Sequence, residues 1–310
     1  MKQKFIIKII ISAILLYFVV HKVNFKEIFW AIENANFNIL LFALFLHIIG
    51  LFLSVLRWKI LLTIQNVKAK IGFLYLSYWV ATFFNLFLPS TVGGDTVRAY
   101  DSWKLGDNKE KAFAVIILDR FLGLLALLIF AVISIMFSDD IAKIVPGIHF
   151  WAFVISLGAG IIIWFIVSPP LEFFLNLSKN QKGLIGKIAG LINKIDIAFS
   201  RFTNKKKSLF LAFILSILLQ LNVVLYYYAI SLALNLKVEF IDYFLIVPLT
   251  IFITMLPISF NGIGLRENAL FLFLAPFGVL LSQAIAFAWI EFGMLLIIGA
   301  VGGIIYMLRK

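Results

Sequence analysis

The sequence predicts an all-α integral membrane protein: a polytopic helical bundle of about six full spans plus two Pro- and Gly-broken re-entrant segments, arranged as inverted repeats. Hydrophobic residues make up 63% of the chain and charged residues only 14%, whereas a soluble domain is roughly half apolar and a quarter charged. The net charge of +12 lies in short stretches between apolar runs, as the positive-inside rule expects. We therefore expect a single transmembrane domain over residues 1–310, with eight hydrophobic segments.

The apolar runs predict six membrane spans and one short interfacial helix. Residues 5–20 are interpreted as an uncleaved anchor, because no small-residue cleavage site follows them. Residues 25–35 have apolar side chains at helical spacing and are expected to form a short interfacial helix. Further full spans are expected at 39–56, 112–137, 148–167, 209–236 and 282–308.

Aromatic and basic residues are expected at the ends of these spans. The run 39–56 is followed by Arg57, Trp58 and Lys59, which is typical of an anchor at the membrane interface. The three consecutive tyrosines at 226–228 are interpreted as part of the same aromatic belt.

Loop charges predict the orientation. Lys and Arg gather at the N-terminus, in 57–70, in 168–207 and at the C-terminus, whereas 138–147 and 235–242 each carry a net charge of −1. The first group, with both termini, is therefore expected in the cytoplasm of a multi-pass cell-membrane protein. The loop 168–207 has eight basic residues against two acidic ones, and we expect it to contact an anionic membrane surface rather than nucleic acid.

A parity argument predicts the re-entrant segments. From the inner stretch 57–70 to the outer loop 138–147 the chain must cross an odd number of times, and the span 112–137 supplies one crossing. The segment 71–95 should therefore enter and leave on the cytoplasmic side. The same reasoning makes 243–281 re-entrant from the outer side.

The two broken segments also resemble each other. In each, an arginine lies nine residues after a proline, and each is followed by a span with an acidic residue, Asp119 in the first and Glu291 in the second. Three expected crossings separate the copies, so they should have opposite orientation, as in transporters with a substrate site near the midplane. We predict repeats at approximately 71–137 and 239–308. The proline and arginine pairs are Pro89 with Arg98 and Pro257 with Arg266.

Phosphate recognition is the chemistry that these segments predict. Broken helices free backbone N–H groups, and these, together with arginine, bind anions such as a lipid phosphate. The structural alternative pairs Arg98 with Asp95 and Arg266 with Glu267, and both can hold at once. The residues expected to bind the lipid head group are Pro89, Gly93, Gly94, Asp95, Arg98, Tyr100, Asp119, Arg120, Pro257, Asn261, Gly262, Gly264, Arg266, Glu267 and Glu291.

The charges inside the spans need partners. Asp119 and Arg120 are neighbours in sequence and point to different faces of a helix, so each should have a partner on another element. For Asp119 the expected partner is Arg98 or Arg266. Glu291 is either the partner of one of these arginines or a proton-coupling carboxylate.

No catalytic residue, cofactor or metal site is expected. The chain contains no cysteine, and it shows neither an HExxH zinc motif nor a P-loop. Residues 92–95 miss the GxGD motif of intramembrane aspartyl proteases because position 92 is valine. The histidines are scattered over separate elements, at His21, His47 and His149.

Three motifs together resemble the lysylphosphatidylglycerol synthase transmembrane family, whose members are also called flippase-like domain proteins. The resemblance covers nearly the whole chain, and the motifs occur in the family's order. They are Leu88-Pro89-x-x-x-Gly93-Gly94-Asp95-x-x-Arg98-x-Tyr100, then Asp119-Arg120-x-x-Gly123, then Pro257-x-Ser259-x-Asn261-Gly262-x-Gly264-x-Arg266-Glu267.

The resemblance implies a multi-span domain that moves lipids or lipid-linked head groups, such as aminoacylated phosphatidylglycerol, between leaflets. In two-domain relatives this domain precedes a cytosolic transferase domain. The sequence ends at Lys310, directly after the last expected span, so we expect the transferase domain and its lysyltransferase activity to be absent.

A lipid flippase acting on a phospholipid or lipid-linked substrate is therefore the leading hypothesis. One alternative is a membrane-embedded transferase with Asp95, Asp119 or Glu291 as general base. Another is a non-catalytic partner of a separately encoded lipid-modifying enzyme.

Overall fold

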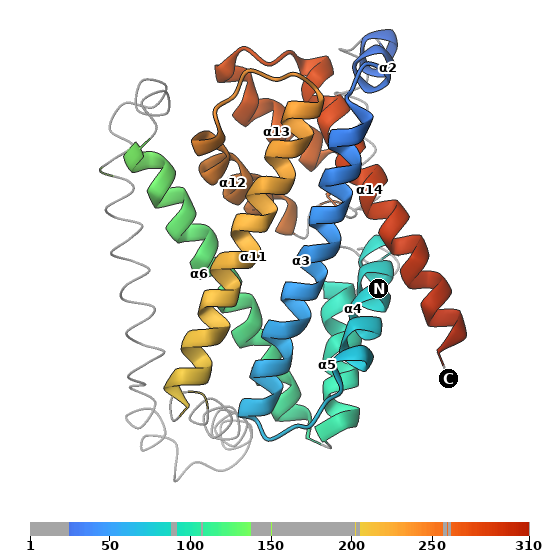
Figure 1. The fold of residues 1–310 in the computed structure, drawn as a ribbon, viewed down its shortest axis with the longest axis vertical. Coiled ribbons are helices and arrows are strands. Elements are labelled where there is room, and N and C mark those ends of the chain that lie inside the picture. The colour runs from blue at the N-terminus through green and yellow to red at the C-terminus, as the bar shows by residue number, and fades with distance from the viewer. Residues whose placement is uncertain are drawn as a thin grey trace, which may run out of the picture.

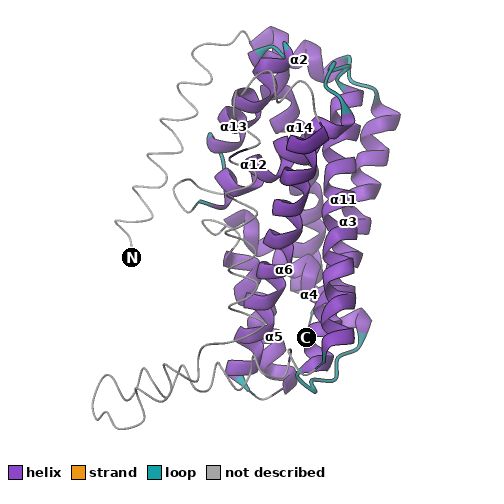
Figure 2. Cartoon of the chain, turned by 90° about the vertical axis from the view of Figure 1, so that its left-hand side faces the viewer, coloured by secondary structure: helices purple, strands orange, loops and turns teal. Residues whose placement is uncertain are grey.

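The computed structural model describes residues 25–87, 92–106, 108–137, 150, 202, 205–256, 259 and 262–309. Every secondary-structure element within these ranges is a helix (Figure 2), which confirms the all-α class. The expected spans at 5–20 and 148–167, and nearly all of the basic loop 168–207, lie outside the described residues.

Four long helices form the frame of the bundle: α3 (Phe37–Ile64), α6 (Lys109–Phe137), α11 (Lys206–Ala233) and α14 (Leu281–Leu308). Each has 28 or 29 residues, which at about 1.5 Å per residue exceeds the roughly 30 Å hydrocarbon core of a bilayer. Within the described part of the chain, these four are long and apolar enough to cross a membrane. The protein is thus a polytopic membrane protein. Large apolar side chains that face outward include Phe45, Phe113, Phe210 and Ile304.

Local hydrogen bonds set where these helices begin. The side chain of Asn36 accepts from the N–H groups of Asn38 and Ile39, at 3.1 and 3.3 Å, and caps α3. At the same end of the bundle, the N–H of Leu280 donates to Gln283 Oε1 at 3.0 Å and begins α14. The short helix α2 (Phe25–Glu33) precedes α3 there (Figure 1).

The first expected re-entrant segment forms a hairpin of two helices, α4 (Ile71–Phe87) and α5 (Val92–Gly106). The two are antiparallel: near one end the Ser77 hydroxyl donates to Asp101, and near the other the Gly94 N–H donates to Asn85 Oδ1 at 2.6 Å. The hairpin lies at the end of the bundle where α3 finishes (Figure 1).

The second expected re-entrant segment forms α12 (Tyr243–Met255) and α13 (Leu265–Leu274), flanked by the short 3-10 helices η1 (Phe240–Asp242) and η2 (Ala275–Phe277). This pair occupies the opposite end of the bundle, near α2 (Figure 1). The two hairpins lie toward opposite ends of the bundle (Figure 1). The placement of both hairpins in the bilayer and their relation as repeats stay predictions.

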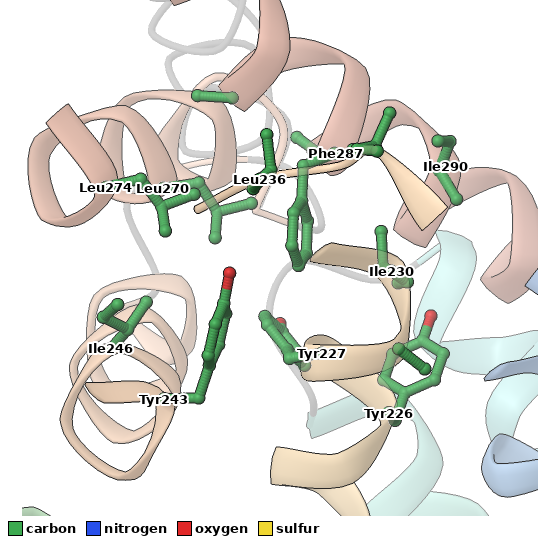
Figure 3. Packing of buried hydrophobic residues seen from close by; sticks show 14 of the residues in the cluster. Tyr226, Tyr227, Ile230, Leu236, Tyr243, Ile246, Leu270, Leu274, Phe287 and Ile290 are labelled. Atoms are coloured by element: carbon green, nitrogen blue, oxygen red, sulfur yellow. The ribbon is translucent and has the colours of Figure 1, made fainter. Parts of the chain in front are cut away.

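Buried apolar side chains divide into two main clusters, one toward each end of the bundle. The cluster at the α12–α13 end contains Tyr226, Tyr227, Tyr243 and Phe287 (Figure 3). The cluster at the α4–α5 end is built around Trp58 and residues of α3, α6 and α11. Polar and charged side chains lie between the two clusters.

Two expectations about interfacial residues are wrong. Tyr226 and Tyr227 do not form an aromatic belt, because both are buried in the first cluster. Arg57 and Trp58 do not anchor the end of a span, because α3 continues to Ile64 and buries both side chains.

Candidate functional site

A cavity of about 370 Å³ lies in the middle of the bundle, where the two hairpins meet the long helices. Its walls come from α3, α4, α5, α6, α11, α12 and α14, so both hairpins contribute. Charged side chains inside a membrane protein are costly and mark functional sites. Those that line this cavity are Arg57, Asp95, Arg98, Asp119, Arg120 and Glu291.

Asp119 on α6 is the centre of the charged cluster. It is buried, and each of its carboxylate oxygens accepts from a different arginine: Arg57 Nε at 2.7 Å and Arg98 Nη2 at 2.8 Å. Arg57 Nη1 also donates to the Ser216 hydroxyl on α11 at 2.9 Å. These bonds join α3, α5, α6 and α11 around one carboxylate.

Asp95 forms the other half of the cluster. It lies in the first turn of α5, where the helix dipole favours a carboxylate. Arg120 Nε donates to its Oδ2 at 2.7 Å, and Arg98 Nη1 lies 3.4 Å from its Oδ1. Three arginines therefore share two aspartates, and the cluster carries one more positive than negative charge.

Arg98 connects the two aspartates and retains a donor. Its guanidinium packs against the rings of Trp58 and Tyr78, with its Cζ 4.9 and 4.6 Å from their centroids. The side chain is buried, and its Nε has no hydrogen-bond partner among the described residues. A buried donor of this kind gains from an added acceptor, so the cluster is suited to an anion.

Two backbone N–H groups of the broken segments, those of Gly94 and Gly264, form hydrogen bonds within their own hairpins. The Gly94 N–H donates to Asn85, and a Cβ at Gly94 would lie 2.8 Å from the Ala81 carbonyl oxygen. The Gly264 N–H donates to Glu267 Oε2 at 2.8 Å. The expectation that these two N–H groups are free for a ligand is therefore wrong, because side chains of the same hairpin already occupy them.

In the second hairpin, Arg266 pairs with Glu291 of α14, with Nε 3.4 Å from Oε2. Glu267 accepts from the Gly264 N–H and caps the start of α13, and it also interacts electrostatically with Arg266. Gly262 and Gly264 have φ of +75° and +79°, a conformation that favours glycine, and they make the turn into α13. Glu291 lines the cavity, and Arg266 and Glu267 are buried outside its lining.

The remaining predicted residues lie elsewhere. Tyr100 is half exposed and packs edge-on against Trp103 rather than lining the cavity. Gly93 is buried but outside the cavity lining. Pro89, Pro257 and Asn261 lie outside the described residues.

Sequence reasoning missed several polar residues of the site. Arg57 is the most important, and Asn85, Ser216, Gln220 and Asn222 also contribute. Gln220 Nε2 donates to the Gly123 carbonyl at 3.4 Å, and Asn222 Nδ2 donates to the Leu46 carbonyl at 2.9 Å. For Ser216, Gln220 and Asn222, the signal that could have found them is the presence of amide and hydroxyl side chains inside the apolar run 209–236.

Comparison with known proteins agrees with the motifs. The family model described as "Lysylphosphatidylglycerol synthase TM region" matches residues 5–303. The chain is also 22% identical to a UPF0104 membrane protein of Pyrococcus horikoshii, over 77% of this chain and 78% of that protein. Because the family model spans nearly the whole sequence, this chain belongs to the lysylphosphatidylglycerol synthase transmembrane region family.

Proposed function

We propose that the protein is a flippase-like transporter that moves a phospholipid or lipid-linked phosphate between the two leaflets. The observation that carries the proposal is the arginine excess around Asp119 and Asp95, enclosed by membrane-spanning helices. Arginine binds phosphate with two parallel hydrogen bonds. The one surplus positive charge of the cluster matches a phosphodiester, which carries one negative charge.

The size of the cavity supports a head group as the ligand. A volume of about 370 Å³ falls within the roughly 300–1,000 Å³ of small-molecule sites. The outward-facing apolar side chains leave the acyl chains in contact with lipid. The head group would thus pass through the protein while the acyl chains remain outside it.

The opposed hairpins support a route to both leaflets. The α4–α5 and α12–α13 hairpins lie toward opposite ends of the bundle (Figure 1), and residues of α4, α5 and α12 line the cavity. In transporters with inverted repeats, one half moves against the other around a central site. Movement of one hairpin at a time would open the arginine cluster to one leaflet and then to the other.

A proteoliposome assay tests the proposal. Vesicles containing the purified chain and a tail-labelled fluorescent phosphatidylglycerol are treated with a membrane-impermeant reductant, and the rate at which inner-leaflet label becomes accessible is measured. Wild-type protein is expected to flip the label faster than the Arg98→Ala/Arg266→Ala double variant, with Lys59→Ala as the control for loss of a charge near the cluster. Equal rates for the wild type and the double variant would rule the proposal out.

A further inference from the structure

The two carboxylates that follow the broken segments have unequal surroundings. Asp119 is held by Arg57 and Arg98, at 2.7 and 2.8 Å. Its counterpart in the second predicted repeat, Glu291, has one arginine, Arg266, at 3.4 Å. Asp119 is thus the ion-pair partner of two buried arginines, whereas Glu291 pairs with one arginine at a longer distance.

The groups around Glu291 come from three helices. Arg266 faces it from α13, and Tyr226 and Tyr227 on α11 are close enough to interact with it electrostatically. Glu291 Oε2 and the Tyr226 hydroxyl are both buried without a hydrogen-bond partner among the described residues. His47 on α3 packs edge-on against Tyr226 at 5.3 Å.

Helix α2 also packs against α14 near Glu291, and its charged side chains are exposed. Helix α2 contacts Trp289 through Phe25 and Phe29. Its titratable residues, Lys26, Glu27 and Glu33, are exposed.

Arg266 is the cationic side chain that pairs with Glu291 at 3.4 Å. Glu267 of the same helix as Arg266 also interacts electrostatically with Glu291, and Arg57, Arg98 and Arg120 line the same cavity.

We propose that Glu291 is the binding site of a proton that is co-transported with the lipid, an inference that rests on the proposed function. Glu291 lines the cavity, and Arg266 lies behind it outside the lining. A head-group phosphate that enters the cavity therefore brings a like charge toward the Glu291 carboxylate. One arginine at 3.4 Å does not offset this added repulsion, so the ionised carboxylate becomes costly inside the membrane.

Proton binding removes that cost. A hydronium ion from the solution on one side gives up a proton: one of its O–H bonds breaks, an O–H bond forms on the Glu291 carboxylate, and the side chain becomes neutral. When the phosphate leaves on the other side, its negative charge is gone, Arg266 again stabilises the ionised carboxylate, and the proton passes to water there. One proton thus accompanies one phosphate in the same direction, and no other reactant is consumed.

The structure favours a proton over a metal cation as the coupling ion. A bound sodium ion would sit beside the Arg266 guanidinium, which lies 3.4 Å from Glu291 and would repel it. A proton meets no such repulsion because it neutralises the carboxylate.

The test measures proton movement in vesicles that contain wild-type protein, fluorescent phosphatidylglycerol in one leaflet and a trapped pH-sensitive dye. Flipping toward the interior is expected to acidify the lumen, and an imposed pH gradient is expected to enrich the lipid on the alkaline side. Lipid flipping that leaves the lumen pH unchanged and ignores the gradient would overturn the inference while the proposed function survives. Enrichment by a sodium gradient alone would overturn it as well, and a wild-type protein that flips nothing would end both proposals.

Variants of Glu291 test whether this carboxylate is the one that binds the proton. Glu291→Gln is expected to lose lumen acidification and gradient-driven enrichment, whereas Glu239→Gln, which removes an exposed carboxylate at the α12–α13 end of the bundle, is expected to keep both. Glu291→Asp, which keeps the titratable group, is expected to restore the proton response. If Glu291→Gln keeps wild-type proton movement, Glu291 is not the coupling site. Thermal unfolding in detergent shows whether each variant is folded. The measurement on wild-type protein shows, independently of the variants, whether proton movement is coupled to lipid flipping.

Discussion

At the scale of single residues, Asp119 is the side chain on which the cavity depends. It is the shared partner of Arg57 and Arg98, and through them it links α3, α5 and α6. Removing one member of a buried ion cluster leaves the remaining charges without compensation, which costs more than the cluster gained by forming. Both the stability of the protein and the charge arrangement of the cavity therefore depend on the Asp119 carboxylate.

Replacing Asp119 with Asn is expected to destabilise the protein strongly. The change leaves Arg57 and Arg98 buried without their carboxylate, at a cost of about 3–5 kcal/mol. The melting temperature in detergent micelles measures the effect. Glu33→Gln, a change of the same kind at an exposed position of α2, is expected to leave the melting temperature nearly unchanged. Similar melting temperatures for the two variants would contradict the role given to Asp119.

Arg57→Lys is expected to lower both stability and the rate of lipid flipping. The guanidinium of Arg57 bonds to Asp119 through Nε and to Ser216 through Nη1, and an ammonium group cannot reproduce this geometry. Lys59→Arg, two residues along the same helix, is the matched control and should behave as wild type. An Arg57→Lys variant with the melting temperature and the lipid-flipping rate of the wild type would show that the shape of the guanidinium is unimportant.

At the scale of elements, α14 and α4 show how closely two helices of this bundle approach. Gly299, Gly302 and Gly303 form the contact face of α14. A Cβ at Gly302 would overlap the Trp79 carbonyl, and one at Gly303 would lie 2.8 Å from the Phe83 ring. Small residues at such a face allow close backbone contact in membranes, and this contact holds α4 beside α14.

Gly302→Ala is therefore expected to separate α14 from α4 and to lower the melting temperature. Gly293→Ala lies in the same helix, where an added Cβ meets nothing within 4 Å. That control is expected to be neutral or stabilising, since alanine favours a helix over glycine by about 1 kcal/mol. Equal effects of the two substitutions would show that the glycine face makes no close contact.

The elements show what the sequence could and could not predict. Apolar runs located α6, α11 and α14 because lipid selects continuous hydrophobicity. The run before Arg57 gave the wrong C-terminal end for α3, because that arginine is buried by a partner 62 residues away in the chain. Burial of Tyr226 and Tyr227 depends likewise on packing against Phe287 and Tyr243, which no local pattern records.

Most of the charged residues of the candidate site could be predicted from the sequence. Asp95, Arg98, Asp119, Arg120 and Glu291 stand out as ionisable residues within or beside apolar runs, and the structure gathers all five around one cavity. The use of the glycine N–H groups was not predictable, because it depends on Asn85 reaching across a turn that sequence spacing does not fix.

At the scale of the whole molecule, the two hairpins lie toward opposite ends of the bundle (Figure 1), and both contribute residues to the lining of the cavity. This opposition is the physical basis for access from either leaflet. If both ends of each hairpin lie on one side of the membrane, the arginine cluster is reached from one side past α4–α5 and from the other past α12–α13. If a hairpin crosses the membrane instead, this route does not exist.

The chain has no cysteine, so single-cysteine labelling in cells with membrane-impermeant reagents tests this topology directly. Lys70→Cys and Lys104→Cys, at the ends of the first hairpin, are predicted to react only from the cytoplasmic side. Glu239→Cys and Leu280→Cys, at the ends of the second, are predicted to react only from the outside. All four positions are exposed. Labelling of Lys70→Cys and Lys104→Cys from opposite sides would contradict the opposed hairpins and the transport route built on them.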